Sequence, residues 1–166
     1  MGTGKSTVGR RLAQMLEFLL VDADHMIERA AGKPITEIFE KDGELRFREY
    51  EFEILESIQK MKNTVISTGG GFVVPPQNME LLKQNCLVVC LWASPEKIWS
   101  RVAHQSHRPL LRTSDPMETI RELLNKRKES YCRADVMIHT DFRLIKEVAQ
   151  QACHHFQAAR RIQEKA

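Results

Sequence analysis

The chain has 166 residues, of which 42% are hydrophobic and 28% are charged, and its formal net charge at pH 7 is +3. This charge excess is too small for a protein that binds a nucleic-acid backbone, and the longest apolar run, residues 86–93, is too short to cross a membrane. The four cysteines have neither disulfide-motif nor zinc-ligand spacing, which fits a reducing compartment. We therefore expect one cytoplasmic domain over residues 1–166, a monomer whose ligands are small anionic molecules rather than nucleic acid or membrane.

The spacing of apolar residues predicts helices and strands in alternation. A helix begins at residue 6, a strand covers 18–22, and three helices follow: one that ends at Gly32, one after Pro34 and a long one over about 44–62. Later strands are predicted within 64–71, at 86–93 and at 136–140, and later helices after Pro76, from 95, over 117–132 and from about 143. This alternation indicates an α/β fold with a parallel sheet flanked by helices, and ligands bound where strands end and helices begin.

Residues 2–7, GTGKST, look like the end of a Walker A loop, which holds the phosphates of a nucleotide. Glycines let backbone N–H groups surround phosphate oxygens, and the helix that follows adds a favourable dipole. We expect the Lys5 ammonium to reach the terminal phosphates and the Ser6 hydroxyl to bind Mg²⁺. A glycine-rich tail is the alternative, although the motif runs directly into an amphipathic helix.

Two acidic residues, Asp22 and Asp24, end the strand that follows. Their spacing of two residues predicts that they lie on the same side of an extended segment. Beside a triphosphate site, such a pair suggests one carboxylate near Mg²⁺ and one that accepts a proton from a substrate hydroxyl. Helix capping is the alternative role for both.

Two further motifs suggest an anion-binding cleft. The run Gly69–Gly71 follows a buried strand and exposes backbone N–H groups, although a loop that needs positive φ angles explains it as well. Arg48 and Glu51 are three residues apart on one predicted helix, so they can pair. Held in this way, Arg48 could bind a carboxylate with two parallel hydrogen bonds.

The polar loop over about 104–116 is long for a compact domain, which indicates either a lid or a disordered segment. As a lid it would carry Arg108 onto a transferring phosphoryl group and exclude water from the reaction.

The motifs together resemble the shikimate kinase family of P-loop small-metabolite kinases, from residue 1 to about residue 150. The family order is Walker A, D-x-D, D-G-E-x-x-F-R-x-x-E, G-G-G, R-P-L-L and a later arginine, and the chain has GTGKST, DAD, DGELRFREYE, TGGG, RPLL and NKR in that order. Walker A alone occurs in many nucleotide enzymes, whereas the ordered set is specific. The resemblance implies a three-layer architecture like that of nucleoside monophosphate kinases, with a shikimate-binding region at about 24–62 and a lid at about 104–116.

The resemblance also implies the activity: ATP-dependent phosphorylation of the 3-hydroxyl of shikimate, in the route to chorismate and aromatic amino acids, with ATP and Mg²⁺. The implied catalytic residues are Asp24, Lys5 and Arg108, and the implied metal site comprises Ser6 and Asp22. ATP is implied to contact Gly2, Thr3, Gly4, Lys5, Ser6, Thr7, Arg101 and Arg108, and shikimate to contact Asp24, Arg48, Gly69, Gly70, Gly71 and Arg127.

Two parts of the family pattern precede the chain. The first Walker A glycine would stand five residues before Gly4, and the family's first strand, at the centre of its sheet, comes earlier still. We hypothesise that Met1 is an internal methionine of a longer protein, and that this chain folds less stably and binds ATP less tightly than one that includes the strand.

Two alternatives to shikimate kinase remain open. One is another small-metabolite kinase, such as a gluconate kinase, which shares the Walker A loop but lacks the TGGG and DGE sets. The other is a related protein that binds shikimate without turnover. Acceptor screening with ATP distinguishes all three.

Overall fold

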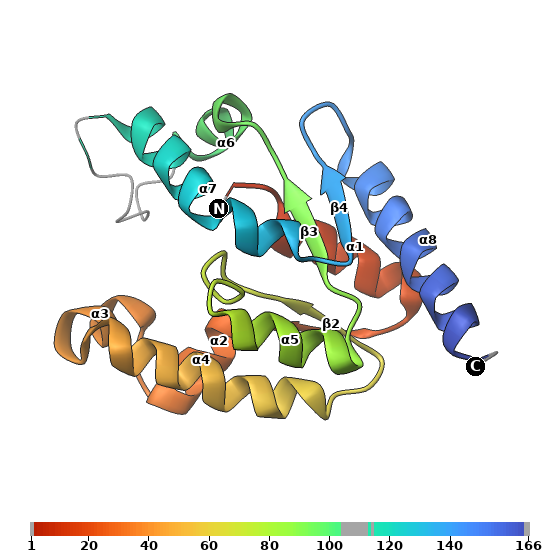
Figure 1. Ribbon diagram of the computed structural model, residues 1–166, viewed down its shortest axis with the longest axis horizontal. Helices are drawn as coiled ribbons and strands as arrows, with labels where there is room; N and C mark the ends of the chain where they lie inside the picture. Colours follow the sequence, from red (N-terminus) through yellow and green to blue (C-terminus); the bar gives the residue numbers. More distant parts are fainter. Residues whose placement is uncertain (1, 104–112, 114, 165–166) are drawn as a thin grey trace.

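The computed structural model describes residues 2–103, 113 and 115–164, which contain eight helices and four strands (Figure 1). The first half consists of α1 (Lys5–Leu16), β1 (Leu19–Asp22), α2 (Ala23–Ala31), α3 (Ile35–Lys41), α4 (Gly43–Gln59) and β2 (Thr64–Ser67). The second half consists of α5 (Pro76–Asn85), β3 (Val89–Trp92), α6 (Pro95–Val102), α7 (Pro116–Cys132), β4 (Val136–His139) and α8 (Ile145–Gln163). Each predicted helix and strand is present.

Local signals in the sequence set many of the boundaries. Proline occupies the first turn of α5, α6 and α7, where its missing N–H costs no helical hydrogen bond. The side chain of Ser94 accepts a hydrogen bond from the Lys97 N–H at the start of α6. The strand predicted at 86–93 is shorter than expected, because only Val89–Trp92 pairs with a neighbour, and α4 ends at Gln59 rather than near residue 62.

The strands form two parallel pairs. In the first pair, β1 lies beside β2 with Leu19 opposite Thr64 and Asp22 opposite Ser67. In the second, β3 lies beside β4 with Val89 opposite Val136. Within the described residues the two pairs are not hydrogen-bonded to each other, and the strand that the resemblance implies at the centre of the sheet is not among the described elements. The predicted fold class, parallel strands flanked by helices, is confirmed.

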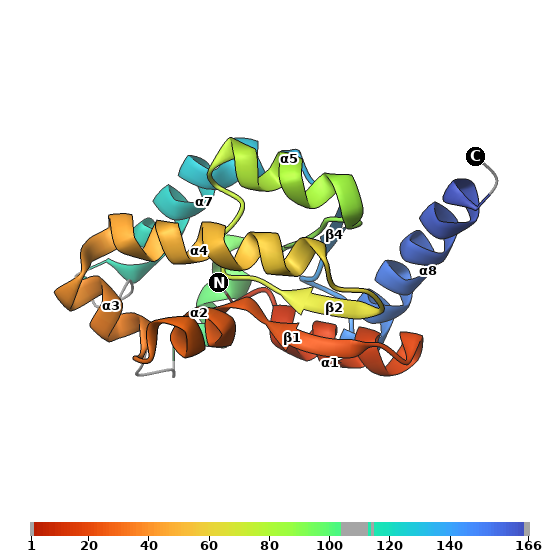
Figure 2. The same cartoon turned by 90° about the horizontal axis from the view of Figure 1, so that it is seen from below.

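Helices cover both sides of the strands. Figures 1 and 2 show α4 and α5 on one side of the β1–β2 pair and α1 on the other, with α8 packed beside α1. One core cluster lies among α2, α3, α4 and α5 and includes Ile27, Leu55 and the fully buried Phe72. A second joins α1, β4 and α8 through Val8, and a third joins α6 to α7. None of the helices in the described part of the chain has the length and apolar composition that a bilayer crossing requires.

Candidate active site

The chain passes from residues 2–4 into α1 through a tight turn. Gly4 occupies the N-cap position, and no side chain forms a capping hydrogen bond to the first amides of the helix. Gly2 and Gly4 have φ angles of 65° and 90°, which glycine adopts without strain. A Cβ at Gly2 would stand 3.0 Å from Cγ1 of Val102, so the backbone packs directly against α6. The amides at the start of α1 and the helix dipole together make this turn a suitable place for phosphate.

Lys5, Ser6 and Thr7 form the first turn of α1. Ser6 and Thr7 are exposed, whereas Lys5 is half-buried and lines a cavity next to the glycine turn after β2. The Lys5 ammonium also lies near enough to Asp24 to lower the pKa of that carboxyl, although other influences on Asp24 are larger. Lys5 at the start of α1 and Asp24 in the first turn of α2 therefore lie near each other.

Arg101 of α6 donates a hydrogen bond to the loop at residues 2–4. Its Nη1 donates to the Gly2 carbonyl at 3.2 Å and to Oγ1 of Thr140 at 3.0 Å, and its Nη2 donates to the Thr140 carbonyl at 2.8 Å. This guanidinium therefore ties the loop to the end of β4. That Arg101 contacts the nucleotide itself stays a prediction.

Asp22 and Asp24 are close together, but the reason given from the sequence is wrong. Asp22 ends β1 and caps α2, its Oδ1 accepting a hydrogen bond from the Asp24 N–H at 3.0 Å, so Asp24 lies in the first turn of a helix rather than on an extended segment. The helix begins here because a carboxylate satisfies the free amides of its first turn. Burial, and then the neighbouring Asp22 carboxylate, raise the pKa of Asp24 above its usual value. A raised pKa makes Asp24 a better proton acceptor when it is ionised.

Arg48 and Glu51 pair on α4 as predicted. Nη1 of Arg48 donates to Oε2 of Glu51 at 2.6 Å, and Nη2 donates to Oε1 of Glu44 at 2.7 Å. Glu51 is only 1% exposed, and burial raises the pKa of its carboxyl, while Arg48 acts in the opposite direction. The two carboxylates hold the planar guanidinium in one orientation, which is the condition for recognising an anion by two parallel bonds.

The glycine turn lies between Asp24 and Arg48. A Cβ built on Gly69 would stand 2.9 Å from Oδ1 of Asp24, and a Cβ built on Gly71 would stand 3.0 Å from Nη1 of Arg48. Side chains at these two positions would displace the acid or the guanidinium. The turn thus brings a carboxylate from α2 and a guanidinium from α4 to its two ends.

Arg127 contributes a second guanidinium from α7. It is half-buried and lies near enough to Glu44 and Glu51 to lower the pKa of both carboxyls. Arg48 and Arg127 therefore share the same acidic neighbours, although they are 79 residues apart in the sequence. Arg108 and most of the predicted lid lie outside the described residues.

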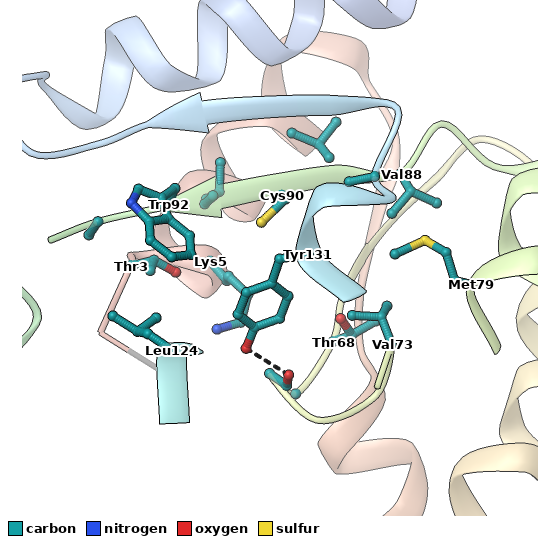
Figure 3. Close-up of a pocket in the computed structure, with 16 residues that line it drawn as sticks. Thr3, Lys5, Thr68, Val73, Met79, Val88, Cys90, Trp92, Leu124 and Tyr131 are labelled. Atoms are coloured by element: carbon teal, nitrogen blue, oxygen red, sulfur yellow. Dashed lines mark hydrogen bonds between the residues drawn. The ribbon is translucent and has the colours of Figure 1, made fainter. Parts of the chain in front are cut away.

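A cavity of about 80 Å³ adjoins Lys5 and the glycine turn (Figure 3), and Asp24, Arg48 and Arg127 are not among the residues that line it. It is bounded by Lys5 of α1, by the glycine turn and by Leu124 and Tyr131 of α7. The consecutive residues 88–93 also line it, and since alternate side chains of a strand point to opposite faces, the cavity runs along the edge of β3 rather than over one face.

Sequence reasoning missed two residues that support the site. The Tyr131 hydroxyl donates to the Gly70 carbonyl at 2.8 Å, and the buried Asn78 amide donates to the Phe72 carbonyl at 2.8 Å. Tyr131 stands four residues after Arg127 on a helix, so their spacing could have placed them on one face. Nothing in the spacing of Asn78 indicates its partner.

The chain is similar to known proteins over most of its length. The family model described as shikimate kinase matches residues 1–157. The chain is 43% identical over 157 residues to the shikimate kinase of Thermodesulfovibrio yellowstonii, covering 95% of this chain and 91% of that relative. It is 42% identical over 151 residues to the shikimate kinase of Caldanaerobacter subterraneus, covering 91% and 88%.

Solved structures give the same result. The shikimate kinase from Acinetobacter baumannii in complex with shikimate superposes with a TM-score of 0.88 at 38% identity, over 96% of this chain and 89% of that one. A gluconokinase from Sinorhizobium meliloti superposes with a TM-score of 0.63 at 17% identity, over 100% and 93%, a likeness that shows the fold alone.

Proposed function

The chain belongs to the shikimate kinase family of ATP-dependent phosphotransferases, and we propose from this premise how its own residues divide the work of phosphorylating shikimate. The product of such a reaction is shikimate 3-phosphate, on the route to chorismate and aromatic amino acids. The substrate carries hydroxyl groups and a carboxylate, so its site needs a proton acceptor and an anion-binding group at a fixed separation.

The position of the glycine turn is the observation that supports this proposal most. Gly69 approaches Asp24 and Gly71 approaches Arg48, with the hypothetical Cβ atoms 2.9 and 3.0 Å from the two side chains. We assign the shikimate carboxylate to Arg48 and Arg127, and the hydroxyl that is phosphorylated to Asp24. The backbone of Gly69–Gly71 would lie against the ring, because three residues without side chains allow close approach.

Asp24 accepts the proton as the hydroxyl oxygen attacks the terminal phosphorus of ATP, while the bond from that phosphorus to the bridging oxygen breaks and ADP leaves. Partial burial and the Asp22 carboxylate raise the pKa of Asp24, so the ionised form binds a proton more tightly than an exposed aspartate does. The nearby Lys5 ammonium limits this rise in pKa and so favours the ionised carboxylate. Correct placement of the two reactants contributes the larger part of the rate.

The nucleotide phosphates would lie on the backbone of residues 2–7, with Lys5 beside the terminal phosphate. Arg101 would support this loop through its bond to Gly2. From the sequence alone, Arg108 is proposed to reach the transferring group from the segment at about 104–116.

Ser6 and Asp22 fit a Mg²⁺ ion by their chemistry. A hydroxyl at the start of α1 and a carboxylate at the end of β1 are hard oxygen donors, and Mg²⁺ usually takes few protein ligands and completes its shell with phosphate oxygens and water. In the described residues no three acidic, histidine or cysteine side chains cluster as a metal cage. When bound, Mg²⁺ would neutralise phosphate charge.

An assay that couples ADP release to NADH oxidation tests the proposal. With ATP and Mg²⁺, shikimate should support turnover, whereas gluconate at the same concentration should not. Binding of shikimate without turnover would favour the impaired-protein alternative, and turnover with gluconate would favour the other kinase class. We also propose that the chain acts as a monomer in the cytoplasm. Sedimentation at micromolar concentration would test the oligomeric state.

A further inference from the structure

The last turn of α7 is attached to the loop between β2 and α5. The Tyr131 hydroxyl donates to the carbonyl oxygen of Gly70 at 2.8 Å, and the Ser130 hydroxyl donates to the carbonyl oxygen of Val74 at 3.4 Å. Figure 3 shows the Tyr131 ring entering the cavity from α7, with its hydroxyl directed at the glycine turn. One helix end therefore contacts this loop at two points.

The Tyr131 ring is itself held in place. It is half-buried and meets the Trp92 ring edge to face, with ring centroids 6.4 Å apart and an interplanar angle of 76°. Trp92 is the last residue of β3, so the ring of Tyr131 rests on a strand while its hydroxyl reaches the turn. A side chain fixed at its ring can hold a hydroxyl in one position.

The glycine turn needs such a constraint. Three consecutive glycines have wide conformational freedom, and the peptide groups on either side of Gly70 can rotate unless a neighbour holds them. Within the turn, the Phe72 N–H donates to the Gly69 carbonyl at 3.2 Å, and the Val74 N–H donates to the Gly71 carbonyl at 3.0 Å. The bond from Tyr131 holds the remaining carbonyl, that of the central glycine.

We propose that Tyr131 is a positioning residue for the acid substrate: it fixes the Gly70 carbonyl and thereby sets the spacing between Asp24 at one end of the turn and Arg48 at the other. This inference rests on the proposed function. Tyr131 also follows Arg127 by four residues on α7. The helix that carries Arg127, one of the two guanidinium groups assigned to the substrate, therefore also positions the turn beside Arg48, the second one.

The test is Tyr131→Phe, which keeps the ring on Trp92 and removes only the hydroxyl. The loss of one hydrogen bond predicts that the KM for shikimate, and its Kd by calorimetry, rise by about 3- to 10-fold. The dissociation constant for ATP should stay within about twofold of the wild-type value, because the hydroxyl that is removed donates to the Gly70 carbonyl in the glycine turn. Tryptophan fluorescence, to which Trp92 and Trp99 both contribute, should be little changed in the absence of ligand, since the ring contact with Trp92 remains.

The matched control is Tyr50→Phe, at the only other tyrosine of the chain. Tyr50 lies on α4, with the guanidinium of Arg46 4.1 Å from its ring centre. This variant should bind shikimate as the wild type does. Ser130→Ala, which removes the longer bond to Val74, should have a smaller effect on shikimate than Tyr131→Phe.

The outcomes separate the inference from the function on which it depends. An unchanged shikimate KM in Tyr131→Phe overturns the inference, and so does an equal loss of shikimate and ATP binding with a lower melting temperature, which indicates a general structural role. If the wild-type chain neither binds nor phosphorylates shikimate, the proposed function fails instead.

Discussion

Arg48 and the buried Glu51 form an ion pair with 2.6 Å between Nη1 and Oε2, although Glu51 is only 1% exposed. The pair matters because a buried carboxylate is costly unless a positive group accompanies it. Glu51 thus depends on Arg48 for its charge, and Arg48 depends on Glu51 for its orientation. The site gains a fixed guanidinium, and the fold gains a group whose ionisation depends on pH.

Glu51→Gln should change how stability varies with pH. Burial raises the pKa of Glu51 above its ordinary value of 4.5, so the folded state holds this proton more tightly than the unfolded chain. The contribution of Glu51 to stability is then fully present below the unfolded pKa and is lost as the pH rises through the folded pKa. The free energy of unfolding of wild type minus that of Glu51→Gln should therefore be greater at about pH 4 than at about pH 8 in urea titrations. A difference that increases with pH would contradict this assignment.

Asp24→Asn should lower the turnover number by about 100-fold or more, because the amide cannot accept the proton of the attacking hydroxyl. ATP affinity should change little, since the amide keeps the size of the side chain. Steady-state kinetics and ATP calorimetry measure the two quantities. The control is Asp42→Asn, at a carboxylate that lies 2.6 Å from the Lys33 ammonium. This variant should leave the turnover number and the ATP affinity at wild-type values.

Two alanine substitutions in the glycine turn should have different effects. Gly69→Ala places a Cβ 2.9 Å from Oδ1 of Asp24, so turnover should fall by about 10- to 100-fold. Gly71→Ala places a Cβ 3.0 Å from Nη1 of Arg48, so the shikimate KM should rise more than turnover falls. The control is Gly9→Ala within α1. A Cβ at Gly9 would lie 3.4 Å from its nearest atom, a Leu20 side-chain carbon, so this variant should alter neither turnover nor the shikimate KM. Identical kinetic changes in the first two variants would argue against separate roles for Asp24 and Arg48.

Arg101→Lys should weaken ATP binding by about 5- to 10-fold, because an ammonium cannot maintain all the hydrogen bonds that the planar guanidinium makes to Gly2 and Thr140. Shikimate binding in the absence of nucleotide should be unaffected. Arg121→Lys on α7 is the control, since Arg121 is 49% exposed and meets Glu96 at 3.4 Å. Calorimetry with each ligand alone measures the two affinities. If the affinities for ATP and for shikimate fell together, the role assigned to Arg101 would be wrong.

An apolar strand placed before Gly2 should stabilise the chain. The cavity beside the glycine turn runs along the edge of β3, and in the described residues β2 and β3 each pair with one neighbour only. Five buried apolar side chains would raise the melting temperature by about 10 °C or more and tighten ATP binding. A leader of the same length made of serine and lysine is the control. Equal melting temperatures and ATP affinities for the two leaders would refute the expected gain in stability from an added strand.

Much of the fold could be predicted from local signals. Apolar spacing indicated each helix and strand, and prolines and glycines marked most ends, because these residues act on the backbone within a few positions. The Arg48–Glu51 pair was predictable because three residues on a helix always bring two side chains to one face. The predicted geometry of Asp22 and Asp24 was wrong because Asp22 caps α2, so the helix begins at Ala23 and Asp24 lies in its first turn.

The sequence by itself determined the elements, the Walker A-like motif at residues 2–7 and the set of charged residues from which the family is identified. Only the tertiary structure decided that Gly69 meets Asp24, that Gly71 meets Arg48 and that Tyr131 holds Gly70. Those contacts join residues that are 23 to 61 positions apart, so no periodicity within one element can encode them. They arise because α2 and α4 bury their apolar faces in one cluster while α7 buries its own against α6, and this packing fixes where their polar side chains meet.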